Sequence, residues 1–125
     1  MRHVFIGDID AQQLIDWRSN LDMSPIGDSD GLYVFIDYTQ TKRITPDALD
    51  IIIDIQKEAK KAGLKRAAVV VNSGVMQMQT ERMARSSAIH SHERYISCDR
   101  TPHWEEAALA WLSDGIEPSA YFPRS

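Results

Sequence analysis

Residues 32–38 read LYVFIDY, an almost unbroken run of apolar and aromatic side chains bounded by turn residues. A strand with one face in water alternates apolar and polar side chains, whereas a strand covered on both faces does not. Residues 66–72, RAAVVVN, have the same character. Because parallel sheets are covered on both faces, the two runs predict central strands of a mainly parallel sheet in an α/β fold.

Shorter segments on either side complete a strand–helix order that repeats four times. Runs of β-forming residues predict the outer strands, and apolar side chains at helical spacing predict the helices between them. Strands that alternate with helices give right-handed crossovers and a parallel sheet. The predicted strands span residues 2–6, 32–38, 66–72 and 94–98, the helices 10–21, 46–62, 75–87 and 102–114, and the loops include 22–31 and 39–44.

Local signals mark where the helices begin and end. Asp10 and Gln13 form a capping-box pair, in which each side chain can satisfy a free backbone amide of the other residue. Thr45-Pro46 places a capping residue before a proline at the first helical position, and Thr101-Pro102 repeats that signal. Gly63 supplies a helix stop.

Length and composition predict one small domain over residues 1–115, followed by a C-terminal tail over residues 116–125. The 14 Lys and Arg against 18 Asp and Glu give a net charge of −4, which argues against nucleic acid as a partner. Cys98 is the single cysteine, so no internal disulfide forms, and we expect a cytoplasmic protein. No apolar run is long enough for an integral membrane segment, which leaves peripheral membrane contact open.

Polar residues follow the predicted strands at one edge of the sheet. Ligands of α/β sheets tend to bind beyond the carboxyl ends of the strands, and helix N-termini there favour anions. Several of the same residues are also what ordinary helix capping needs. We take Asp37, Thr39, Thr41, Arg43, Thr45 and Ser73 as candidates for binding a ligand or partner, with Lys42, Asn72, Arg100 and Thr101 nearby.

Two apolar residues of the predicted helix 46–62, Leu49 and Ile53, lie one turn apart and outside its main apolar stripe. If that stripe packs on the sheet, these two side chains point sideways. They would then meet the next helix, a ligand cleft or a partner chain. Because four strands are few, a homodimer that shares a sheet edge is a further alternative.

The sequence lacks the usual catalytic and phosphate-binding motifs, so we expect no catalytic residues, no metal and no cofactor. The remaining enzymatic alternative is Cys98 as a nucleophile near His103. His90 and His92 form a pair at metal-ligand spacing, although no further ligand is evident beside them. A buried, unreactive thiol and a solvated histidine pair are the simpler interpretations.

Four stretches resemble the STAS and SpoIIAA-like domains, a bacterial group classed with Sec14-type lipid-binding domains. They are VFIDYTQTKRITPDAL, KRAAVVVNSGVMQMQTERMAR, ERYIS and EEAALAWL. The resemblance implies a small sheet with helices packed mainly on one side. It also implies a role like that of the anti-sigma factor antagonists, whose phosphorylated serine opens the second helix. Pro46 stands at that position here, and Thr45 or Thr41 is the nearest hydroxyl.

Two functions follow as hypotheses. The first is a non-enzymatic regulatory or binding domain that recognises a protein partner or a small, anionic or apolar ligand at the strand ends. The second is a carrier of a lipid or another apolar small ligand, bound between helix 46–62 and the sheet. The second rests on Leu49, Ile53 and the likeness to the lipid-binding domains.

Overall fold

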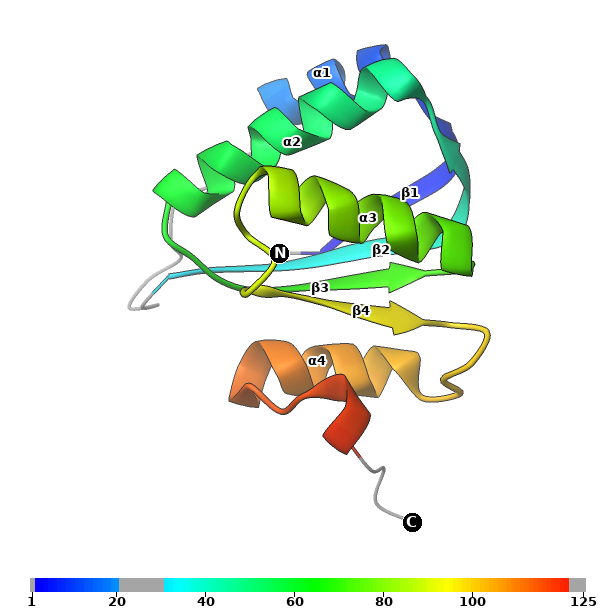
Figure 1. The fold of residues 1–125 in the computed structure, drawn as a ribbon, viewed down its shortest axis with the longest axis vertical. Coiled ribbons are helices and arrows are strands. Elements are labelled where there is room, and N and C mark those ends of the chain that lie inside the picture. Colours follow the sequence, from blue (N-terminus) through cyan, green and yellow to red (C-terminus); the bar gives the residue numbers. More distant parts are fainter. Residues whose placement is uncertain (1, 21–30, 122–125) are drawn as a thin grey trace.

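The computed structural model describes residues 2–20 and 31–121 (Figure 1). Within these residues, strands and helices alternate along the chain as the sequence predicts. The strands form one sheet in the order β1-β2-β3-β4, and every neighbouring pair is parallel. The elements are β1 (Arg2–Ile9), α1 (Ala11–Ser19), β2 (Leu32–Ile44), α2 (Pro46–Lys61), β3 (Leu64–Val71), α3 (Gly74–Ser86), β4 (Glu93–Ser97), α4 (Trp104–Asp114) and a 3₁₀ turn, η1 (Pro118–Ala120).

The helices lie in two layers on either side of the sheet. Strand order follows chain order, so the three crossovers step in the same direction, and crossovers of one hand then place their helices on one face. Figure 1 shows α1, α2 and α3 on that face and α4 with η1 on the other. Within the described residues, no helix is long and apolar enough to cross a membrane.

The central strands are buried on both faces, which confirms the prediction from their apolar runs. In β3, Val69 and Val71 pack in the cluster beneath α1, α2 and α3. The alternate residues, Ala68 and Val70, pack with Trp111 of α4 on the opposite face. The predicted α/β class with a mainly parallel sheet is therefore confirmed.

The strands at one end of the sheet are longer than predicted. Residues 39–44 are the second half of β2 and not a loop, and β1 continues through Gly7-Asp8. The two segments pair with each other across shifts in register, and Gly7 has a φ of +77°. Thr41 and Ile44 are buried in this pairing. Pairing with a neighbouring strand therefore outweighs the polar character of the segment.

Most predicted helix ends are confirmed, but two signals act differently. Gln13 N donates to Asp10 Oδ1 at 2.9 Å and Asp10 N donates to Gln13 Oε1 at 3.0 Å, which completes the capping box. Pro46 opens α2, but the Thr45 hydroxyl donates to Asp47 and caps no backbone amide. The last helix begins at Trp104 and not at Pro102, because residues 102–103 form a turn.

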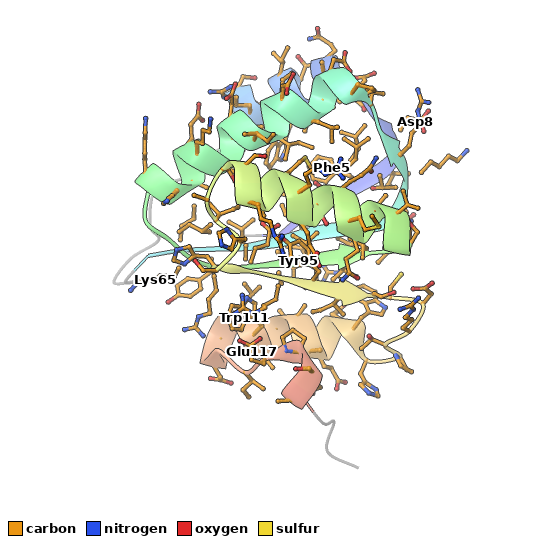
Figure 2. The ribbon with its side chains drawn as sticks, in the orientation of Figure 1. Phe5, Asp8, Lys65, Tyr95, Trp111 and Glu117 are labelled. Atoms are coloured by element: carbon orange, nitrogen blue, oxygen red, sulfur yellow. The ribbon has the colours of Figure 1, made fainter. Side chains whose placement is uncertain are left out.

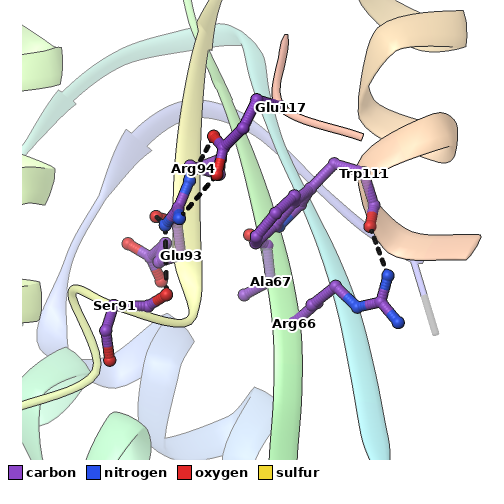
Figure 3. A network of polar contacts seen from close by, with 7 residues as sticks. All are labelled: Arg66, Ala67, Ser91, Glu93, Arg94, Trp111 and Glu117. Atoms are coloured by element: carbon purple, nitrogen blue, oxygen red, sulfur yellow. Dashed lines mark hydrogen bonds and ion pairs between the residues drawn. The ribbon is translucent and has the colours of Figure 1, made fainter. Parts of the chain in front are cut away.

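Trp111 anchors α4 to the far face of the sheet (Figure 3). Its indole Nε1 donates to the carbonyl of Ala67 in β3 at 3.0 Å, and Arg66 Nη1 donates to the Trp111 carbonyl at 3.1 Å. The Arg94 guanidinium lies 4.3 Å from the Trp111 ring centre and donates to both carboxylate oxygens of Glu117, at 2.7 and 2.9 Å. The chain after α4 is thereby tied back to β4.

The predicted tail is held in place as far as the structure describes it. The Tyr121 hydroxyl donates to Glu106 Oε2 of α4 at 3.0 Å, and its ring packs against the cluster around Trp111. The rest of the tail, residues 122–125, and most of the predicted loop 22–31 lie outside the described residues.

We expect Trp111→Phe to lower the free energy of unfolding by about 1–3 kcal/mol. The ring stays, but Ala67 loses the indole N–H that its carbonyl accepts. Trp104→Phe on the same helix is the control, because the half-buried Trp104 indole makes no hydrogen bond to the described residues. Urea unfolding at pH 7 measures both variants, and equal losses of stability would contradict the anchoring role.

Candidate functional site

The strand-end residues predicted as a site lie together, but their polar groups are engaged within the protein. Asp37 is buried, and its Oδ1 accepts from the Thr39 amide at 2.9 Å and from the Thr39 hydroxyl at 2.6 Å. Arg2 Nη2 donates to Asp37 Oδ2 at 3.2 Å. Burial by itself would raise the pKa of Asp37, but the hydrogen bonds from Thr39 and Arg2 outweigh it and lower the pKa. This carboxylate is part of the framework.

The other hydroxyl and amide groups at this edge hold backbone in place. The Thr41 hydroxyl donates to the Phe5 carbonyl at 2.8 Å, and Ser73 Oγ accepts from the Met76 amide at 3.1 Å as the cap of α3. Asn72 Nδ2 donates to three carbonyls of β2, the shortest at 2.7 Å to Thr41. Arg43 is mostly exposed and stands 3.9 Å from Asp8. No geometry at this edge singles out a bound anion.

Among the described residues, no hydrogen bond links the Cys98 thiol to His103, His90 or His92. Burial, and next the neighbouring Asp99, raise the pKa of the Cys98 thiol, so its reactive thiolate is disfavoured. His90 is exposed and His92 is half-buried, and His92 Nδ1 lies 3.1 Å from the Lys65 carbonyl oxygen. In the described part of the chain, no three His, Cys, Asp or Glu side chains are placed to hold a metal ion.

Leu49 and Ile53 lie where α2 meets α3. They line a surface groove together with Val75 and Met78, whose exposed fractions are 69% and 65%. Both residues are half-buried and also pack against the cluster beneath α1, α2 and α3. Packing against the next helix therefore accounts for part of their surface, and the groove exposes the rest.

A cavity of about 80 Å³ lies between the sheet and the three helices that cover this face. Residues of all four strands form its floor and α2 forms its roof, while α1 stands on one side and α3 on the other. Apolar side chains make up most of the lining. The floor includes Phe5, Val34, Ile36, Ala67 and Val69, the roof Ile52, Ile55, Gln56 and Ala59, and the sides Leu14, Trp17, Thr80, Met83 and Ile89.

The register of the sheet places the polar residues of this face at opposite ends of the cavity. His3 pairs with Ile36, Ile36 with Val69, and Val69 with Tyr95, so one row crosses all four strands. Glu93 pairs with Ala67 two residues earlier on β4. The polar ends are therefore separated by three strand spacings, which is about 14 Å. Figure 2 shows Phe5 and Tyr95 on the same side of the sheet, away from Trp111.

Glu93 brings a carboxylate to the β4 end of the cavity. The residue is 4% exposed, and its Oε1 is buried without a hydrogen-bond partner among the described residues, as is the hydroxyl of Tyr95. Burial raises the pKa of Glu93 to about 7, and the nearby Tyr95 hydroxyl only partly offsets the rise. The pKa of Tyr95 is raised in turn, by burial and then by the charge of Glu93. Near neutral pH this carboxyl group is therefore divided between its protonated and ionised forms.

His3 brings a ring nitrogen to the β1 end. Its Nδ1 accepts a hydrogen bond from the Trp17 indole at 3.1 Å, so the neutral ring carries its proton on Nε2. Nε2 is buried, and the structure describes no partner for it. Burial lowers the pKa of His3, which keeps the ring neutral. The cavity thus has an acceptor at one end and a donor at the other.

Sequence reasoning missed Glu93, Tyr95 and His3. The available signal was the alternation Glu93-Tyr95-Ser97, which places a charged residue on the same face of the strand as an aromatic residue. Beginning the strand at Arg94 left Glu93 outside it, whereas β4 begins at Glu93. The sequence carries no comparable signal for His3, because its burial depends on α1 and Trp17.

We expect Glu93→Gln to become stabilising, relative to the wild type, as the pH rises from 4.5 to 8. Between its ordinary pKa of 4.5 and its folded value of about 7, the folded protein holds a proton that the unfolded chain has released. Wild-type stability therefore falls with rising pH in this window, by on the order of 3 kcal/mol in total. Glu93→Gln lacks this titration. His3 contributes equally to the pH dependence of both proteins, so its contribution cancels when their free energies of unfolding are subtracted.

Urea unfolding at pH 4.5, 6 and 8 measures this difference, with Glu117→Gln as the control. Hydrogen bonds from Arg94 lower the pKa of Glu117, so this pair stabilises the fold above the ordinary pKa of a glutamate. Because this contribution is already largely present at pH 4.5, the control should be less stable than the wild type by a nearly constant amount from pH 4.5 to 8. Parallel profiles for Glu93→Gln and the wild type would show that Glu93 is not buried as described.

Comparisons of the chain with protein-family models, with curated proteins and with solved structures found no match. The resemblance to STAS and SpoIIAA-like domains therefore stays a prediction from the sequence. A functional proposal for this chain rests on the cavity and on the polar groups at its two ends.

Proposed function

We propose that this protein is a non-enzymatic binding domain that takes up a small apolar molecule in the cavity between α2 and the sheet. The observation that carries the proposal is the cavity itself, about 80 Å³ of space whose lining is mostly apolar. Protein interiors are close-packed, and voids larger than a water molecule are few. Binding sites for small molecules are typically apolar cavities with a few placed polar groups.

The size of the cavity limits its ligand. An apolar cavity of about 150 Å³ takes up benzene, so one of about half that volume suits a single small ring or a short branched chain. A lipid acyl chain would need α2 to move away from the sheet. Of the two hypotheses from the sequence, binding beneath helix 46–62 is thus supported in its small-ligand form.

Recognition at the strand ends has less support. A site there would offer polar groups to a ligand, but Asp37, Thr41 and Ser73 use theirs to hold the backbone. The cavity has the opposite property, because buried polar atoms of Glu93 and His3 have no partner within the described residues. Buried polar groups are nearly always hydrogen-bonded, so unpaired ones beside a cavity favour a ligand there.

We expect Ala59→Leu to weaken the binding of furan or benzene at least about tenfold. Ala59 lines the roof of the cavity, and leucine adds three carbon atoms to that space. Ala62→Leu is the matched control, because Ala62 follows α2 directly, is half-buried and lies outside the lining. Titrations followed by backbone amide chemical shifts give the dissociation constants.

The same titrations locate the ligand. In the wild type, the amide chemical shifts that change on adding ligand should belong mainly to α2 and to the middle of β2 and β3. Shifts confined to Val75 and Met78 would place the ligand in the surface groove, and shifts near Ser73 would place it at the strand ends. Either of these results, or no shift with any small apolar molecule, would overturn the proposal.

A further inference from the structure

One oxygen of the buried carboxylate at the β4 end of the cavity, Glu93 Oε1, has no hydrogen-bond partner among the described residues, although the Tyr95 hydroxyl lies near this carboxylate. Glu93 lines the cavity, is 4% exposed, and its Oε1 accepts no hydrogen bond from any residue that the structure describes. A buried acceptor without a donor is unfavourable, and such a group in a folded protein calls for a water, an ion or a ligand. The cavity next to it is the space such a partner would occupy.

Two other polar side chains of the lining, Thr80 and Gln56, already make hydrogen bonds within the protein. The Thr80 hydroxyl donates to the Gln77 carbonyl at 3.0 Å within α3. Gln56 Oε1 in α2 accepts from the Ser87 hydroxyl at 2.7 Å. Glu93 pairs in the sheet with Ala67, whose methyl group fills little of the adjacent floor. The β4 end of the cavity therefore combines free space with one unpaired acceptor.

We propose that Glu93 selects, among small apolar molecules, those that carry an N–H or O–H donor, and that this donor binds Glu93 Oε1. The inference rests on the proposed function and deepens it, because it names the chemical class of the ligand. An ionised carboxylate accepts hydrogen bonds only, and bonds to a charged acceptor are stronger than those between neutral groups. A ring without a donor would leave Oε1 unpaired.

Ionisation of Glu93 should tune this preference. The titratable and charged groups around it are Tyr95 on its own strand, Tyr38 on β2 and His3 at the β1 end, while Glu81 and Arg85 of α3 act on Tyr95. Burial holds the pKa of Glu93 near 7, whereas the tyrosine pKa values are raised and both rings stay protonated. A donor-bearing ligand favours the ionised carboxylate, so its affinity should rise with pH.

Pyrrole and furan test the proposal as a matched pair. The two rings are similar in size, but pyrrole has an N–H donor where furan has an oxygen. Affinities are measured at pH 8 by amide chemical-shift titration for the wild type and Glu93→Met, which removes the acceptor at similar volume. We expect the preference for pyrrole over furan to be at least about tenfold greater in the wild type than in Glu93→Met.

Glu117→Met is the control, because it makes the same substitution at an exposed carboxylate outside the cavity lining, and it should keep the wild-type preference. If Glu93→Met does not fold, the wild type alone decides, since its preference for pyrrole should increase from pH 5.5 to pH 8.5. A preference that changes with neither pH nor the Glu93 substitution would overturn the role of Glu93 and leave the proposed function standing. Failure of both rings to bind would overturn the two together.

Discussion

The central strands β2 and β3 contact helices on both of their faces, and the remaining structure depends on this double burial. Parallel strands cannot be joined by tight turns, so each strand is followed by a helix that crosses back over the sheet. Because the strand order follows the chain order, three such helices share one face. The opposite face of β2 and β3 would then be exposed without α4, which Trp111 attaches to the Ala67 carbonyl.

The same arrangement explains where the cavity lies. Three helices cover one face, and beneath α2 the floor at β3 is built from short side chains, Ala67 and Val69. Longer side chains such as Trp17 and Met83 fill the two sides. Space is therefore left under the middle of the roof. A filled core would be more stable, because atoms that line a void lose dispersion contacts. Ligand binding would account for a cavity that costs stability in this way.

Glu93 adds an electrostatic cost to the same place. A carboxylate with its pKa raised to about 7 by burial destabilises the fold at neutral pH. A leucine at this position would pack against Ala67 without that cost. A carboxylate oxygen that has no partner among the described residues and lies next to an apolar cavity is the kind of placed polar group that small-molecule sites use to orient a ligand.

The sequence by itself determined the features that depend on near neighbours. The apolar run at residues 32–38, the Asp10 capping box and the helix stop at Gly63 predict a strand, a helix start and a helix end, and each is present. These signals are readable because the interacting groups lie within a few residues of one another. They gave the order of elements and the α/β class.

Tertiary structure alone decided the features that join distant segments. Residues 39–44 became strand because β1 pairs with them, and the last helix started at Trp104 because a turn intervenes after the Thr101-Pro102 signal. Glu93 and His3 are far apart in the chain, and only the sheet register brings them to one cavity. A cavity is a property of how side chains from all layers fill a shared space, and no local pattern encodes it.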